Sequence, residues 1–177
     1  GNTLGLVNQA LHQRAVVSKA ETRKQRQQRK SCESRLWIEG TRPLPSDRKI
    51  VDVCDRGADA FPFICHEARS GRTFLIRSKT NRNCFVGHEN QTESAKLHPY
   101  ARSLPVAGTW ELAVTSKTEM KSPNRKGKKI PVTRTSRTAN MAISFGAVQL
   151  KPGKSDKIPP VPVWVLRVWE TDPPAGQ

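Results

Sequence analysis

Acidic residues are scarce in this sequence. Of its 177 residues, 31 are Lys or Arg but only 15 are Asp or Glu, so the formal net charge is +16. A strongly basic protein attracts polyanions, because its Lys and Arg side chains release the counterions that are condensed on them. The composition therefore favours a nucleic acid as the partner.

Long apolar runs are absent as well. No stretch approaches the roughly 18 consecutive apolar residues of a transmembrane helix, and no segment combines Trp, Phe or Leu with a Lys-rich helix face. We therefore expect no contact with a membrane. The first residues, Gly1–Gly5, show neither a start methionine nor the charged start and apolar centre of a signal peptide. We expect a fragment or a processed form of a protein.

The cysteines are few and widely spaced: Cys32, Cys54, Cys65 and Cys84. This pattern differs from the dense spacing of a secreted disulfide scaffold and favours a reducing compartment. Together with His66 and His88 the cysteines suggest zinc, but structural zinc ligands come in pairs about two to four residues apart. We expect the cysteines to be small core residues instead. No glycine-rich phosphate loop and no Cys–His nucleophile pair is visible.

A strand, a helix and a second strand are predicted in the middle of the chain. The β-branched run Ile50–Cys54 reads as a buried strand. It leads to a helix at about Ala60–Ser70, which Asp59 caps and Gly71 ends. The expected inward face of that helix is Phe61, Ile64, Cys65 and Ala68. Thr73–Ser78 is a second short buried strand, and a β-α-β unit of this kind is normally parallel and right-handed.

Charged residues follow both strands directly. Asp55 comes after the first strand, and Arg77 and Lys79 come after the second. In open α/β sheets, sites form where the strands end, because the sheet fixes the backbone there while side chains reach open space. A carboxylate at such a place in a basic protein suggests Mg²⁺, which bridges carboxylates to substrate phosphate. Asp52 and Asp59 are better explained as turn formers, caps or ion-pair partners.

The segment before the central unit is largely basic. It contains a predicted strand at Thr3–Arg14, a run of Lys, Arg and Gln at Val16–Lys30, and a predicted short helix at Ser31–Glu39. The basic run is either a solvated loop or an arm that contacts phosphate.

After a helical turn at His98–Ser103 the pattern becomes that of an antiparallel meander. Its strands lie in Thr109–Thr118, Val132–Leu150 and Val161–Glu170. The basic loop Lys121–Lys129 connects two of them as a hairpin, and it either contacts phosphate or is only mobile.

The residues around Asp55 resemble those of a known family. Val53–Asp59 reads Val-Cys-Asp-Arg-Gly-Ala-Asp, which resembles the Val-Cys-Asp-Arg-Glu-Ala-Asp signature of the DDE transposases of the insertion-sequence-four group, the group with the Tn-five transposase. Gly57 replaces the Glu of that signature. Phe74–Lys79 is similar to the Phe-Val-Val-Arg-Ser-Lys strand that follows in the family. Leu4–Arg14 looks like the strand before the signature, and the basic loop with Trp164–Gly176 falls where the family has an inserted β-subdomain.

The resemblance implies an α/β fold with a partial ribonuclease-H-like core in residues 1–104. It also implies an inserted antiparallel β-subdomain, truncated at its C-terminal end, in residues 105–177. The full-length protein would be a bacterial DNA transposase, an endonuclease that cuts transposon ends and joins them to target DNA by two-metal phosphoryl transfer. It would dimerise on double-stranded DNA in the cytoplasm, where it associates with the nucleoid.

Within this family, Asp55 falls on the second acid of the Asp-Asp-Glu triad. It would be a catalytic ligand for Mg²⁺ or Mn²⁺. The other two acids belong before Leu4 and beyond Gln177, so we expect this chain alone to bind no metal and to catalyse nothing. Arg77 and Lys79 fall on positions that contact transposon-end DNA. The full set of predicted DNA-binding residues is Arg77, Lys79, Arg82, Lys121, Arg125, Lys126, Lys128 and Lys129.

Two other interpretations stay open. In the first, the chain is a non-catalytic basic module that binds DNA or RNA, and Asp55 is merely structural. In the second and weaker one, the protein holds a structural metal. Acids at the matching positions outside this sequence would favour the transposase.

Overall fold

A computed structural model describes residues 33–45, 49–87, 93–121, 130–153 and 158–174, together with residues 5, 8, 9, 22 and 25. The predicted strand Thr3–Arg14 and the basic run Val16–Lys30 lie almost entirely outside the described residues. The chain divides into two compact units, one formed by residues up to 85 and 149–163, the other by 86–148 and 164–177. Both β8 (Arg137–Leu150) and β9 (Val161–Glu170) contribute residues to the two units, and the predicted boundary between residues 104 and 105 stays a prediction.

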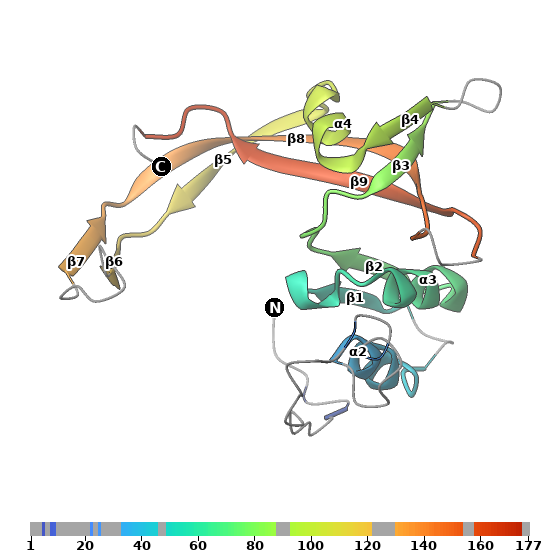
Figure 1. The fold of residues 1–177 in the computed structure, drawn as a ribbon. Coiled ribbons are helices and arrows are strands. Elements are labelled where there is room, and N and C mark those ends of the chain that lie inside the picture. The colour runs from blue at the N-terminus through green and yellow to red at the C-terminus, as the bar shows by residue number, and fades with distance from the viewer. Residues whose placement is uncertain are drawn as a thin grey trace. The chain divides into compact units, whose positions relative to one another are not determined.

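The first unit contains the predicted β-α-β unit. Strand β1 (Val51–Cys54) and strand β2 (Thr73–Ile76) are parallel neighbours, with Val51 opposite Thr73 and Cys54 opposite Ile76. Helix α3 (Phe61–Ser70) connects them, and it ends at Gly71, whose φ of 72° favours glycine. Helix α2 (Glu33–Thr41) packs on α3 (Figure 1), with the rings of Trp37 and Phe63 6.0 Å apart. The order and direction of these elements confirm the prediction.

The prediction that both strands are buried is wrong for one of their faces. Val51, Val53 and Leu75 are 57, 73 and 50% exposed. Asp52 alternates to the other face and pairs there with Arg72, the second residue after α3, so it is an ion-pair partner. Since the described helices α2 and α3 lie on that side, only one face of the two-stranded sheet is covered among the described residues.

Two expectations about α3 are also corrected. Its N-cap is Ala60, and no side chain caps the helix, because the Asp59 carboxylate is bonded to the loop after β2 instead. Phe61, Ile64 and Cys65 are buried as expected, but Ala68 is exposed, while Phe63 and Glu67 are buried. The buried face is displaced because α2 covers Phe63 and because Glu67 has polar partners in the interior.

A larger sheet holds five strands in the order β4-β3-β8-β5, with β9 also paired to β8. Strand β8 pairs antiparallel with β3 near its end and with β5 near its start. A short helix, α4 (Leu97–Ser103), confirms the helical turn predicted at His98–Ser103. The strands are β3 (Asn83–Val86), β4 (Glu93–Lys96), β5 (Gly108–Val114), β8 (Arg137–Leu150) and β9 (Val161–Glu170). The predicted strand Val161–Glu170 is therefore confirmed.

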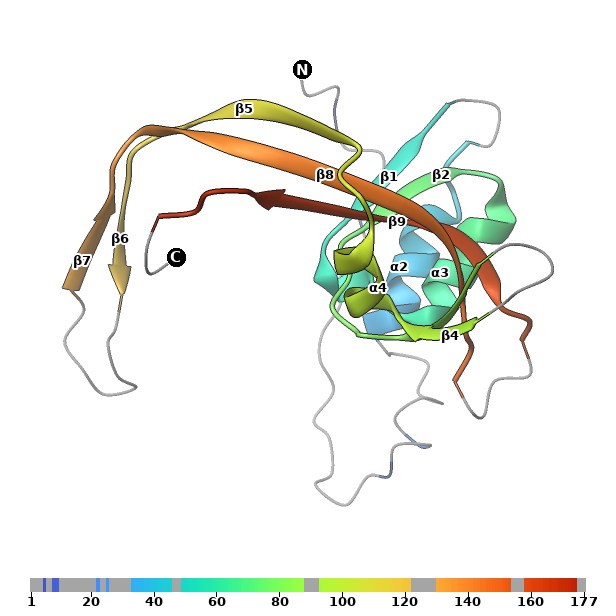
Figure 2. The same cartoon turned by 90° about the horizontal axis from the view of Figure 1, so that it is seen from above.

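Strands β5 and β8 continue into a two-stranded ribbon (Figure 2). Strand β6 (Lys117–Lys121) pairs antiparallel with β7 (Ile130–Arg134). The register continues without a break from one pair to the next. Val114 opposes Arg137, and Lys117 opposes Arg134, three residues closer to the hairpin loop on each strand. The hairpin predicted around the basic loop is confirmed in its strands, although residues 122–129 lie outside the described part. The single strand expected at Thr109–Thr118 is divided between β5 and β6.

The described residues thus form a mixed α/β fold with several sheets and few helices. None of the helices in the described ranges is both long and apolar enough to cross a membrane.

Candidate nucleic-acid and metal site at the strand ends

Asp55 lies directly after β1, where it begins a short 3₁₀ turn, η1 (Arg56–Ala58). Its Oδ1 accepts a hydrogen bond of 2.7 Å from the backbone N–H of Gly57. The residue is exposed. The carboxylate is therefore oriented by the backbone of the turn while it stays accessible to solvent.

Arg77 leaves β2 at the same edge of the sheet. Its backbone N–H donates to the carbonyl of Cys54 over 3.1 Å, so Arg77 lies next to the residue that precedes Asp55. Arg77 and Lys79 are both exposed. The parallel pairing of β1 and β2 thus brings an exposed acid and two exposed cations to one sheet edge, as strand ends of this kind were expected to do.

The loop after β2 is held by Asp59, whose side chain is only 3% exposed. Its Oδ2 accepts from the backbone N–H groups of Lys79 and Thr80 at 2.7 and 2.6 Å. Its Oδ1 accepts from Nη2 of Arg82 at 2.7 Å and from Nε at 3.2 Å. Burial opposes ionisation of Asp59, but the bonds from Arg82, Lys79 and Thr80 outweigh it and lower the pKa.

These bonds confirm that Asp59 is an ion-pair partner and turn former. They also give Arg82 a structural task, because its guanidinium holds the loop and its side chain is only 15% exposed. A DNA contact by Arg82 stays a prediction.

Gly57 stands against the carboxylate of Asp55. A Cβ atom at this position would lie 3.0 Å from Asp55 Oδ1 and 3.3 Å from a ring carbon of Trp37. Contacts this short are tighter than nearly all real Cβ contacts. A side chain here, such as the Glu of the transposase signature, requires Asp55 or Trp37 to shift.

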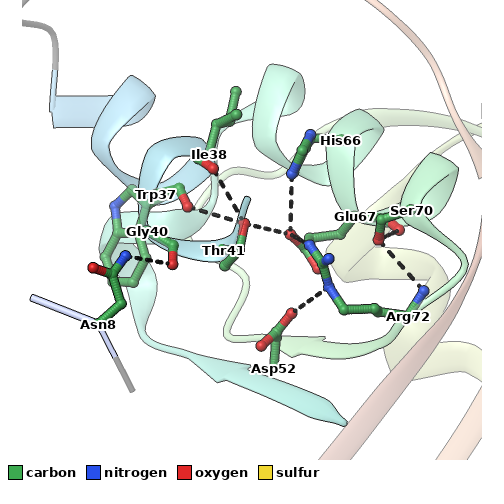
Figure 3. A network of polar contacts seen from close by, with 10 residues as sticks. All are labelled: Asn8, Trp37, Ile38, Gly40, Thr41, Asp52, His66, Glu67, Ser70 and Arg72. Atoms are coloured by element: carbon green, nitrogen blue, oxygen red, sulfur yellow. Dashed lines mark hydrogen bonds and ion pairs between the residues drawn. The ribbon is translucent and has the colours of Figure 1, made fainter. Parts of the chain in front are cut away.

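A second group of charged residues is buried between β1 and α3 (Figure 3). Arg72 donates from Nε to Asp52 Oδ2 and from Nη2 to Glu67 Oε1, both over 3.2 Å. Thr41 Oγ1 donates to the same oxygen of Glu67 over 3.0 Å. The side chains of Glu67, Arg72 and Asp52 are 0, 8 and 10% exposed.

The pKa of Glu67 is raised, mainly by burial and then by its hydrogen bond with Asp52, while Thr41 and Arg72 act in the opposite direction. Both acids are thus engaged inside the protein and are not available to a metal at the strand ends. Glu67 was not predicted as a buried residue. Its position in the sequence offered one indication, because it follows the apolar helix residues Phe63 and Ile64 and precedes a possible ion-pair partner, Arg72.

Of the three cysteines in the described ranges, Cys65 and Cys84 are core residues. Cys65 and Cys84 are buried and, like the half-buried Cys54, form no disulfide. Burial, together with the charges of Asp52, Glu67 and Asp55, raises the pKa of Cys54 to about 11. At neutral pH it is therefore a thiol rather than a thiolate ligand or nucleophile.

Across the described ranges, no three His, Cys, Asp or Glu residues lie close enough together to hold a metal ion. Cys32 and His88 fall outside those ranges. In the described part of the chain, Asp55 therefore belongs to no group of three such side chains.

The basic loop can be placed only by the strands that carry it. Arg125, Lys126, Lys128 and Lys129 lie outside the described residues, and for Lys121 only the backbone, at the end of β6, is described. Nearby, Lys117 forms an ion pair with Glu119 at 2.9 Å and remains 68% exposed.

Comparison with known proteins gives no assignment. No protein-family model matches the chain, and no curated protein matches it.

Proposed function

We propose that the chain is the middle portion of the catalytic domain of a DDE transposase of the insertion-sequence-four group, and that it binds duplex DNA at the β1–β2 edge. The observation that carries the proposal is the position of Asp55 after β1 beside Arg77 after the parallel strand β2. An exposed carboxylate next to cations suits a site that holds a divalent ion and a DNA phosphate together.

In the proposed enzyme, Asp55 is one of three acids, and the other two lie in parts of the protein outside this chain. Its carboxylate is a hard oxygen ligand of the kind that Mg²⁺ and Mn²⁺ prefer, and the hydrogen bond from the Gly57 N–H orients it. The bound ions would activate the attacking oxygen and stabilise the leaving one. One carboxylate rarely displaces the water shell of Mg²⁺, so the chain alone is proposed to be inactive.

Arg77 and Lys79 would contact phosphate beside this acid. Both are exposed, and the backbone N–H of Lys79 is held by the Asp59 carboxylate, so little conformational freedom is lost when DNA binds. The β6–β7 ribbon would bring the basic loop to a second contact, since a two-stranded β-ribbon fits the major groove. The full-length protein is proposed to act in the bacterial cytoplasm and to dimerise on its DNA.

The first test is the affinity of the 177-residue chain for duplex DNA as a function of salt. Each phosphate contact contributes about 0.9 to the slope of log affinity against log salt. The double variant Arg77→Ala, Lys79→Ala should therefore lower the slope by roughly two. The matched control Arg35→Ala, Arg69→Ala removes the same charge from exposed positions on α2 and α3 and should leave the slope unchanged.

A second candidate is a non-catalytic basic module. One observation favours it: the Asp55 carboxylate caps η1, and a purely structural residue would do the same. The complete protein that contains this chain separates the two. The transposase proposal expects Asp55→Asn to abolish Mg²⁺-dependent DNA cleavage while DNA binding remains. If the complete protein binds DNA but never cleaves it, the module is the better account. If the chain does not bind DNA at low salt, both proposals fail.

A further inference from the structure

One face of the sheet formed by β5, β8 and β9 is apolar and, among the described residues, largely uncovered. Trp110 lies opposite Met141, and Leu112 lies opposite Ala139. Directly opposed residues in an antiparallel pair project from the same face, and so do alternate residues along a strand. Met141, Ile143 and Phe145 therefore continue the face that carries Trp110 and Leu112.

Strand β9 adds to the same face. The rings of Phe145 and Trp164 are 5.9 Å apart, which places Trp164 beside Phe145. Leu166 and Val168 follow Trp164 at alternate positions. Glu170, two residues further, is paired with Arg137 of β8 (Nη2 to Oε2, 2.8 Å), which agrees with this assignment because Arg137 is an odd-numbered residue of β8 like Phe145.

Helix α4 covers part of the opposite face, around Ser144 and Gly146 of β8. Ser144 Oγ donates to the carbonyl of Ala101 over 3.4 Å. A Cβ atom at Gly146 would lie 2.8 Å from Leu104 and 3.0 Å from the hydroxyl of Tyr100. The α4 residue Arg102 accepts a hydrogen bond from Arg167, an odd-numbered residue of β9. Helix α4 thus packs on the side of β8 that carries Ser144 and Gly146 (Figure 1), whereas Phe145, between them on the other side, is 50% exposed.

The open face is large enough to be an interface. Its apolar side chains, with their exposed fractions, are Trp110 (41%), Leu112 (46%), Phe145 (50%), Trp164 (64%), Leu166 (49%) and Val168 (52%). At roughly 150–250 Å² for a large side chain, they leave on the order of 600 Å² of apolar surface. This is at the upper limit for the largest patch of a typical monomer, about 300–600 Å². It also slightly exceeds the apolar share, about 450–520 Å², of the roughly 800 Å² that each partner contributes to a standard interface.

We propose that this face, defined by the six side chains above, is a self-association surface that packs on the same face of a second copy of the chain. Sheet faces pack well on one another at about 10 Å, and a twofold axis lets an apolar patch meet itself. In the described parts of β5, β8 and β9, the ionic side chains on this face are Arg137 and Glu170, which neutralise each other at its border. Two copies can therefore meet here without burying an unpaired charge.

Single-stranded nucleic acid is the other occupant that exposed aromatic side chains suggest. A base-stacking platform needs cations that follow the phosphate backbone. Arg137 is engaged by Glu170, and Arg167 points to the α4 side. The charge pattern of the face therefore favours a protein surface of the same kind.

The two kinds of binding should respond to salt in opposite ways. Two copies of a chain with a net charge of +16 repel each other, and salt screens this repulsion, since the Debye length falls from about 10 Å at 0.1 M to about 3 Å at 1 M. Self-association should thus strengthen with salt, whereas DNA binding weakens with it. Failure of one proposal can in this way be told apart from failure of the other.

The test is sedimentation velocity of nuclease-treated protein at about 0.1 and 1 M NaCl. The wild type should form dimers, and more of them at high salt. Leu112→Glu and Leu166→Glu each place like charges across the twofold axis and should raise the dimer dissociation constant at least about tenfold. The matched control is Ala113→Glu, the exposed neighbour of Leu112 on the opposite face of β5, which should change it by less than about twofold.

Circular dichroism establishes that the three variants are folded. A wild-type chain that stays monomeric at high salt overturns the proposal, and so does a dimer that Leu166→Glu leaves intact. A monomer whose tryptophan fluorescence is quenched by an oligothymidine strand in the wild type but not in Leu166→Glu assigns the face to nucleic acid and also overturns it.

Discussion

The β1–α3–β2 unit contains two groups of charged residues that are alike in composition and opposite in environment. The interior group is Asp52, Glu67 and Arg72, which are at most 10% exposed and bonded to one another. The edge group is Asp55, Arg77 and Lys79, all exposed. Asp52 and Asp55 are only three residues apart in the sequence, so exposure and partners, not residue type, decide which acid is open to a ligand.

The alternation of β1 explains the difference. Asp52 projects toward Arg72 and Glu67, whereas Asp55 comes after the last strand residue and lies in the turn η1. An acid inside the strand is held by the side chains that pack on the sheet. An acid just past its end is held only by the backbone of the turn, which leaves it accessible.

Loss of Arg72 should give the largest effect on stability. Arg72→Met leaves Asp52 and Glu67 buried next to each other without their shared cation, which should cost about 3–5 kcal/mol in the free energy of unfolding. Urea denaturation measures it. Arg77→Met, the same exchange at the edge, should change stability by no more than about 0.5 kcal/mol. Equal losses in the two variants would contradict the division into interior and edge groups.

Asp59 resembles the interior group in that its side chain is only 3% exposed, but it holds the loop that carries Lys79 of the edge group. Asp59→Ala should lower stability by about 2–3 kcal/mol, since it removes the carboxylate that accepts from Arg82 and from two backbone N–H groups, and leaves Arg82 only the carbonyl of residue 59. DNA affinity should fall as well, because Lys79 is no longer positioned. The control Thr80→Ala keeps the backbone N–H of residue 80. If Asp59→Ala binds DNA like the wild type, this loop does not position a contact.

The pH dependence of the Asp59 contribution has a definite sign. The pKa of Asp59 in the folded protein lies below its ordinary 3.8, so the contribution is present at neutral pH. It is lost as the pH falls below about 3.8 toward the folded pKa. The stability difference between wild type and Asp59→Asn should therefore shrink in that acid range.

Local sequence patterns predicted the order and direction of the elements in the first unit. The β-branched run, Pro62 in the first turn of α3 and Gly71 at its end are local signals. The burial of Glu67 is not local, because its partners Thr41 and Arg72 come from before β1 and after α3. Periodicity favoured Ala68 for the core, since an acid enters a helix core only when distant residues satisfy it.

The open face of the larger sheet left a signal that was not interpreted. Val161–Glu170 was predicted to be a strand. From Val163 to Val168 every residue except Arg167 is apolar. A strand without a polar face is typical of one that is covered on both sides. The sequence therefore indicated that β9 needs a second covering layer. The covering layers of β9 could not be predicted, because α4 is distant from β9 in the sequence and a partner molecule is not part of it.

Glu67→Gln should give the smallest effect and tests the interior group most finely. Gln keeps an acceptor for Thr41 and Arg72 and gains a donor for Asp52, so stability at pH 7 should stay within about 1 kcal/mol of the wild type. The raised pKa of Glu67 means that the folded protein holds this proton more tightly than the unfolded chain, whose ordinary value is 4.5. Wild-type stability from this group therefore falls as the pH rises through 4.5 toward the folded pKa. Gln does not titrate, so the urea midpoint of the variant should rise relative to that of the wild type as the pH is raised from 4 to 7. The opposite trend would mean that Arg72, rather than burial, controls the ionisation of Glu67.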